Sequence, residues 1–156
     1  MKAMLLTELV NVRTHSTPLS LQELPEPVPA DGEILIKILT CGVCHTELDE
    51  IEGRTPPPRF PIILGHQVVG LVEKTGIAAR NFRPGDRVGV AWIYSACGTC
   101  QFCRQGNENL CHEFKATGRD AHGGPKGHLT IEEEKQQGAH ENKTDHPIVI
   151  HRFQSV

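Results

Sequence analysis

Long apolar runs are missing from this chain of 156 residues. The amino-terminal stretch reaches Glu8 after only a short apolar run, too short for the core of a signal peptide. No later window approaches the roughly 20 apolar residues that a membrane helix needs. The sequence therefore predicts neither a membrane protein nor an exported one, and a cytoplasmic location is the expectation.

A cluster of basic residues is missing too. Lys and Arg together number 16 against 19 Asp and Glu, the formal net charge is −3, and the cations are scattered singly. Proteins that neutralise phosphates or anionic lipid concentrate their positive charge on one face. We therefore expect no nucleic acid and no membrane surface among the partners. The sequence also lacks internal repeats and any Gly-x-Gly-x-x-Gly segment, the fingerprint of a dinucleotide-binding Rossmann fold.

What the sequence does contain is a series of short β patterns. Alternating or apolar segments recur at residues 33–39, 68–74 and 87–90. Proline, glycine and aspartate separate them, as in 25–32 and 83–86, where turns are expected. Only residues 46–52 suggest a helix, barely two turns long. The pattern predicts a mainly β fold with few short helices.

The character of the chain changes at Pro125. Residues 131–137 are charged and rich in amides, and four of the nine histidines follow position 127. The segment contains few apolar side chains, and their burial cannot offset the conformational entropy lost when the segment is ordered. We predict a largely disordered or weakly attached polar tail over residues 125–156, with 146–151 as its only strand candidate.

Six cysteines occur in the chain, and four of them form a dense motif. Cys97, Cys100, Cys103 and Cys111 are separated by two, two and seven residues. Four thiolates from one loop can close a tetrahedral zinc shell, which leaves no open position and indicates a structural role. Two disulfides are the alternative, which the expected intracellular location disfavours. A nucleic-acid zinc ribbon fits less well, because it pairs two separated Cys-x-x-Cys knuckles. We predict a structural zinc lobe at residues 95–113.

A second group of motifs lies upstream. The segments are Cys41-Gly-Val-Cys44-His45-Thr46-Glu47-Leu48-Asp49 and Gly65-His66-Gln67-Val-Val-Gly70. On its own, the Cys-x-x-Cys could be a redox pair, and a lone His66 could be an ordinary core residue. Together with the segment 84–88 and the four cysteines, in this order, they resemble the signatures of zinc-dependent medium-chain alcohol dehydrogenases. The resemblance covers residues 1–124.

The resemblance implies a GroES-like β-barrel for residues 1–124 and a catalytic zinc site. Cys44 and His66 would be two zinc ligands, with a third Cys or His arriving later in the chain, while Cys41 is interpreted as a free thiol. The implied reaction is oxidation of a small alcohol to an aldehyde or ketone, with NAD or NADP accepting the hydride. A complete enzyme of this kind could form a homo-oligomer.

Four further residues receive roles from the same resemblance. Thr46 would pass the substrate proton outward, and Glu47 would orient His66 by accepting its second ring N–H. Asp49 stands where the family often has a relay histidine, which makes the outer relay uncertain. His45 would face the cofactor phosphate in the full enzyme; the alternative is a solvated residue at the start of the helix.

The resemblance stops near Gly124. No cysteine follows Cys111, and no Rossmann fingerprint follows at all. We interpret this as a frameshifted or truncated reading frame, which makes the chain an inactive dehydrogenase fragment on its own. The alternative is a non-catalytic, zinc-stabilised β module that acts in binding or oligomer contacts. A count of bound zinc separates the two interpretations.

Overall fold

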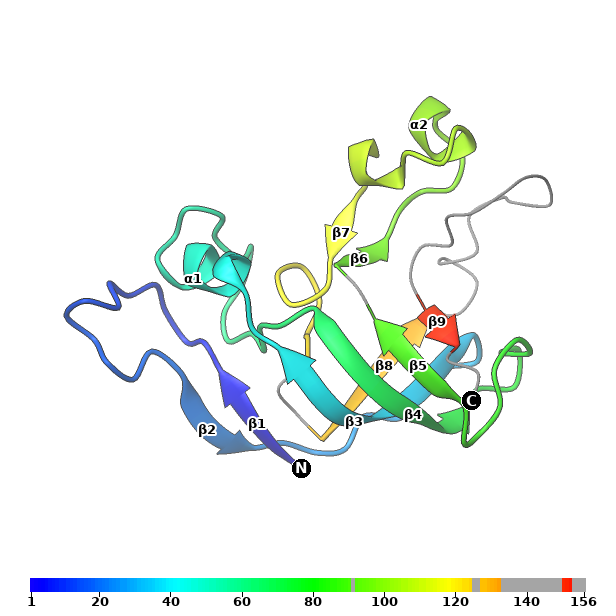
Figure 1. The fold of residues 1–156 in the computed structure, drawn as a ribbon, viewed down its shortest axis with the longest axis horizontal. Helices are drawn as coiled ribbons and strands as arrows, with labels where there is room; N and C mark the ends of the chain where they lie inside the picture. The colour runs from blue at the N-terminus through cyan, green and yellow to red at the C-terminus, as the bar shows by residue number, and fades with distance from the viewer. Residues whose placement is uncertain (91, 125–126, 133–149, 153–156) are drawn as a thin grey trace.

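The strands predicted from the alternating segments form the centre of the molecule. The computed structural model describes residues 1–90, 92–124, 127–132 and 150–152, and Figure 1 shows their arrangement. The three predicted strands are β3 (Glu33–Gly42), β4 (Gln67–Thr75) and β5 (Arg87–Val90). Along β4 buried side chains alternate with more exposed ones, the period expected of a strand with one face against a core.

A five-stranded antiparallel sheet joins these strands in the order β8-β3-β4-β5-β9. The outer strands are β8 (His128–Glu132) and β9 (Ile150–Arg152). Two smaller antiparallel pairs flank the sheet: β1 (Lys2–Leu5) with β2 (Ser20–Glu23), and β6 (Ile93–Ser95) with β7 (Lys115–Ala116). The prediction of a mainly β fold is therefore confirmed.

The main core lies on one face of this sheet and draws on four of its strands. Its members are Ile34, Ile36, Val68, Val72, Ala79, Val88, Val90, Leu129 and Ile131. A second cluster of Leu6, Ile51, Ile62 and Leu64 packs the end of the helix α1 (His45–Ile51) against the amino-terminal segment. Burying each aliphatic side chain contributes about 1.5–3 kcal/mol, so α1 is held mainly by Ile51, its last residue.

Strand β8 corrects one prediction from the sequence. Residues 146–151 were expected to hold the only strand after Pro125, yet β8 pairs with β3 over five positions, from Lys37 opposite His128 to Glu33 opposite Glu132. Leu129 and Ile131 of β8 are fully buried. The expected strand at 146–151 overlaps β9, while residues 125–126, 133–149 and 153–156 of the predicted tail lie outside the described residues.

The cysteine-rich segment forms a separate lobe. It runs from β6 through the short helices α2 (Gln101–Arg104) and η1 (Glu108–Leu110) to β7, and Figure 1 shows it extending away from the sheet at the top of the view. Packing of Trp92 against Phe114, with ring centroids 5.1 Å apart, joins the two arms of the lobe near its base. Across the described ranges, no helix is long and apolar enough to cross a membrane.

Candidate metal centres

Cys44 and Glu47 together build the start of α1. Cys44 is the N-cap, in extended conformation, and its sulfur accepts a hydrogen bond from the backbone N–H of Thr46 at 3.4 Å. The carboxylate of Glu47 accepts one from the backbone N–H of Cys44 at 2.7 Å. This reciprocal pattern is a capping box, which satisfies two amides that the helix leaves unpaired. It also fixes the positions of both side chains.

His66 is held beside the start of β4 by close backbone packing. Gly65, which precedes it, has a φ of 93°, a left-handed conformation that glycine adopts without strain. The carbonyl of Gly65 accepts a hydrogen bond from Gly124 N at 3.0 Å. A Cβ atom on Gly123 would lie 2.0 Å from that same carbonyl oxygen. The loop ending at Gly124 can therefore pack against Gly65, next to His66, because its contacting residues are glycines.

The two segments bring Cys44, Glu47 and His66 into one group. The sulfur of Cys44 lies 3.5 Å from Nε2 of His66, while Oε1 of Glu47 lies 2.9 Å from Nδ1 of the same ring. Glu47 and His66 are both buried. Because Glu47 meets the nitrogen that faces away from Cys44, its position suits orienting the ring rather than binding an ion between Cys44 and His66.

Glu47→Gln tests the orienting role expected for this residue. Glutamine keeps the size and can still accept from Cys44 N, but it removes the charge next to Nδ1 of His66. Loss of such an outer-shell partner typically weakens metal binding by about 10-fold to 100-fold. We expect that weakening in a cobalt competition titration, with Glu8→Gln, an exposed site, unchanged. Equal affinities for the two variants would contradict the role.

The other residues predicted around this site lie further out. Thr46 is half-buried beside Cys44. The side chain of His45 is 77% exposed, and its Nε2 lies 3.7 Å from Oδ1 of Asp49. The carboxylate of Asp49 also accepts a hydrogen bond from Nε of Arg54, so it has a charged partner within the chain. The sequence analysis did not predict the role of Arg54, because the sequence of a proline-rich loop does not show which residue an arginine in it will contact.

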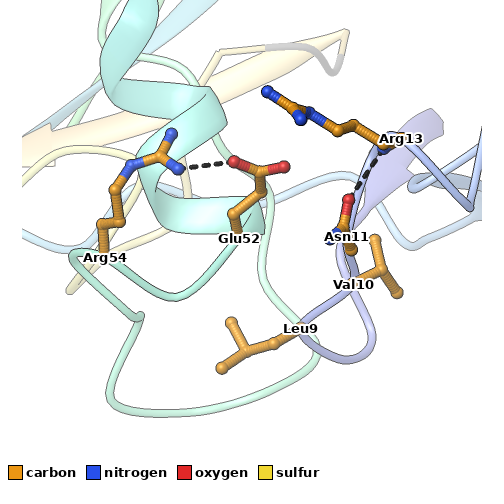
Figure 2. Close-up of a pocket in the computed structure, with 6 residues that line it drawn as sticks. All are labelled: Leu9, Val10, Asn11, Arg13, Glu52 and Arg54. Carbon is orange, nitrogen blue, oxygen red and sulfur yellow. Dashed lines mark hydrogen bonds and ion pairs between the residues drawn. The ribbon is translucent and has the colours of Figure 1, made fainter.

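A pocket lies at the other end of α1. Leu9, Val10, Asn11, Arg13, Glu52 and Arg54 line a pocket of about 540 Å³. Figure 2 shows Glu52 and Arg54 reaching toward each other on one side, with Arg13 above the amino-terminal loop. Glu52 is the C-cap of α1, whereas Cys44 caps its start. None of the predicted site residues lines this pocket.

Glu50 is a buried carboxyl that the sequence analysis also missed. Its side chain is 0% exposed, and neither carboxylate oxygen has a hydrogen-bond partner. Burial is the main cause, and the negative charge of Glu47 the second, of a rise in the pKa of Glu50 from 4.5 to about 7, which the nearby Arg119 partly opposes. Near neutral pH this carboxyl therefore holds a proton for much of the time.

This shift makes stability depend on pH. Because the pKa of Glu50 is higher in the folded chain than in the unfolded one, its contribution is fully present below about pH 4.5 and is lost as the pH rises through about 7. Glu50→Gln mimics the protonated form, so it should remove that loss, on the order of 2–3 kcal/mol above pH 8. Urea unfolding at pH 5 and pH 8 measures this loss of unfolding free energy. The control variant Glu8→Gln should show the same pH dependence as the native chain. If the native chain and Glu50→Gln lost the same unfolding free energy between pH 5 and pH 8, the proposed role of Glu50 would be excluded.

The lobe brings its four cysteines together as predicted. The ligand atoms of Cys97, Cys100, Cys103 and Cys111 all lie within 4.8 Å of one another, and every cysteine in the chain is a free thiol. Cys103 sulfur lies 3.5 Å from that of Cys100 and 3.9 Å from that of Cys97. Cys41 belongs to none of the three groups of metal-ligating side chains found among the described residues.

Backbone amides point at these sulfurs. Cys97 sulfur accepts from Cys100 N at 3.3 Å, and Cys111 sulfur accepts from Glu113 N at 3.3 Å. Hydrogen bonds from the backbone of Thr99 and Cys100 lower the pKa of Cys97 to about 6. Such bonds favour the thiolate, which is the form that binds metal. The donor set and its surroundings therefore fit a closed, structural zinc ion.

Comparison with known proteins agrees with this geometry. The family model for the alcohol dehydrogenase GroES-like domain matches residues 30–139. The chain belongs to the alcohol dehydrogenase family and carries its GroES-like domain. An alcohol dehydrogenase of Geobacillus stearothermophilus is 41% identical over 114 residues, which are 72% of this chain and 34% of the relative. One from Rhizobium meliloti is 44% identical over 113 residues, 72% of this chain and 33% of the relative.

Solved structures agree on the fold. A zinc-binding dehydrogenase of Sinorhizobium meliloti bound to NADP superposes with a TM-score of 0.74 at 30% identity. The alignment covers 86% of this chain and 36% of that structure. The chain thus spans about a third of the length of the relatives that it matches. The GroES-like fold predicted from the motifs is confirmed.

Proposed function

We propose that this chain is the zinc-holding, substrate-side part of an NAD- or NADP-dependent alcohol dehydrogenase, and that it is inactive without a nucleotide-binding domain. The observation that carries the proposal is the group made by Cys44, His66 and Glu47. It offers one sulfur and one imidazole nitrogen 3.5 Å apart, with a carboxylate behind the ring. Two protein ligands leave positions free for a substrate oxygen. Cytoplasmic thiol conditions would keep all six cysteines reduced.

Each residue has a distinct part in this proposal. Cys44 and His66 would hold a zinc ion, which when bound would supply Lewis-acid chemistry to the oxygen of an alcohol substrate. Glu47 holds the imidazole of His66 in one orientation and one tautomer. Thr46, on the first turn of α1 beside Cys44, carries the substrate proton toward solvent through its hydroxyl. His45, exposed on the outer side of the helix, is placed to meet an anionic cofactor group.

A zinc count tests the proposal. The native chain should hold two zinc ions at its cysteine sites, one very tightly in the four-cysteine group and one more weakly at Cys44 and His66. Cys44→Ser should remove only the weaker ion, and Cys41→Ser should remove neither. A native chain with a single zinc that Cys44→Ser leaves in place would instead support the non-catalytic β module.

Openness of the second site needs its own measurement. Cobalt placed at Cys44 and His66 should show a visible spectrum that shifts when imidazole is added, because an added ligand can enter free positions. The four-cysteine group should not respond, since its shell is closed. We expect no NADH formation from ethanol by the chain alone. Turnover by the purified chain would contradict the part of the proposal that requires a second domain.

A further inference from the structure

A third group of metal-ligating side chains shares no residue with either cysteine site. Glu26 follows β2, Glu73 is in β4, and His128 begins β8. Their ligand atoms all lie within 4.8 Å of one another. The three residues come from three separate parts of the sequence, and the pairing of β8 with β3 is what brings His128 into the group. We propose that Glu26, Glu73 and His128 form a site for a divalent cation of the zinc or manganese type.

His128 is the centre of this group. Its Nε2 lies 2.7 Å from Oε2 of Glu73, and its Nδ1 lies 4.0 Å from Oε2 of Glu26. The side chain is only 15% exposed, and both ring nitrogens are buried without a hydrogen bond of good geometry. Buried polar nitrogens normally have such a partner. The ring nitrogens of His128 therefore lie close to two carboxylates without forming well-directed hydrogen bonds to them.

The charge balance favours a cation. Two carboxylates bring two negative charges, and Lys74, whose Nζ lies 3.3 Å from Oε1 of Glu26, supplies one positive charge. Both glutamates remain partly open to solvent, so water can complete the coordination of an ion. The remaining negative charge and the imidazole together suit a divalent cation better than they would suit a second lysine side chain, because an imidazole nitrogen can coordinate a metal ion.

The donor set limits which ion fits. One imidazole nitrogen with two carboxylate oxygens is a mixed nitrogen and oxygen set, which binds zinc or manganese and lacks the sulfur that softer ions prefer. Calcium and magnesium prefer oxygen alone. Only one ring nitrogen can bind the ion, and Nε2 is the candidate because it lies nearer a carboxylate. Glu26 would then shift toward the ion from its contact with Lys74.

Manganese separates this site from the cysteine sites. Thiolates select zinc, so a chain loaded with two equivalents of zinc has its sulfur ligands filled, and added manganese reports on the glutamates and histidine. Electron paramagnetic resonance of free manganese should show one ion bound per chain. A third equivalent of zinc should displace it. His128→Gln removes a direct ligand, so it should weaken binding by more than the roughly 10-fold to 100-fold that loss of an outer-shell partner costs.

Matched variants keep the test decisive. His15→Gln changes an exposed histidine and should bind manganese as the native chain does. Glu26→Gln removes a ligand that lies in a loop outside the strands, so it should weaken binding while leaving the circular dichroism spectrum unchanged. Failure of the native chain to bind manganese would show that the group is only an imidazole held by two carboxylates. Binding that survives both His128→Gln and Glu26→Gln would overturn the proposal as well.

Discussion

Replacing Cys103 with serine should unfold the lobe and remove one zinc ion from the chain. Cys103 is the most buried of the four cysteines, and its sulfur lies within 4 Å of two others. Structural zinc contributes on the order of 10 kcal/mol of apparent binding energy in zinc-finger peptides. Even a fraction of that matters, because each kcal/mol moves the melting temperature of a chain this size by roughly 2–4 °C.

The expected outcome is a fall in melting temperature on the order of 10 °C. Calorimetry and metal analysis on the same samples measure it. Cys41→Ser is the matched control, since Cys41 packs against the sheet core and lies outside the zinc group. It should keep the full zinc content. A Cys103→Ser chain that retained both its zinc and its melting temperature would mean that the four sulfurs do not share an ion.

Shortening Ile131 to alanine should cost the chain about 2–5 kcal/mol of unfolding free energy, the usual range for a buried isoleucine. Ile131 lies opposite Ile34 in the β3–β8 pair and is fully buried in the main core. The prediction decides whether the segment after Pro125 is a loosely attached tail or part of the sheet. Urea denaturation gives the difference in unfolding free energy between the native chain and Ile131→Ala, provided that the two have similar m-values.

Val28→Ala provides the comparison for that measurement. Val28 is 85% exposed, so its truncation should change stability by no more than about 0.5 kcal/mol. If Ile131→Ala were as mild as Val28→Ala, β8 would contribute nothing to the core, and the tail expected from the sequence would begin at Pro125 after all. The interpretation of this segment as frameshifted stays a prediction, which the other two reading frames of the DNA can test.

The metal groups could be predicted because their information is local. Cys97, Cys100 and Cys103 lie within seven residues, and a loop that short can gather its sulfurs with little help from the rest of the fold. Cys44 and Glu47 are likewise three residues apart on one helix turn. Pairing these with His66 depended on the family resemblance, since nothing in the spacing joins positions 44 and 66.

What sequence patterns missed depends on contacts between distant segments. β8 has the period-two pattern, with Leu129 and Ile131 between polar neighbours, but it is short and leads into a charged stretch. Glu50 shares its helix face with Glu47 and Ile51, and all three are buried. A glutamate at that position normally predicts a solvated face. Only the packing of the surrounding loops shows that it is covered.

The strand order has a consequence for any shortened version of this chain. β8 and β9 flank the sheet on its two outer sides, beside β3 and β5, and both come from beyond Gly124. Deleting everything after that residue would expose the hydrogen-bonding groups of both inner strands at once. Bare strand edges are templates for pairing between molecules, so the shortened protein should self-associate into aggregates even if its zinc groups remain intact.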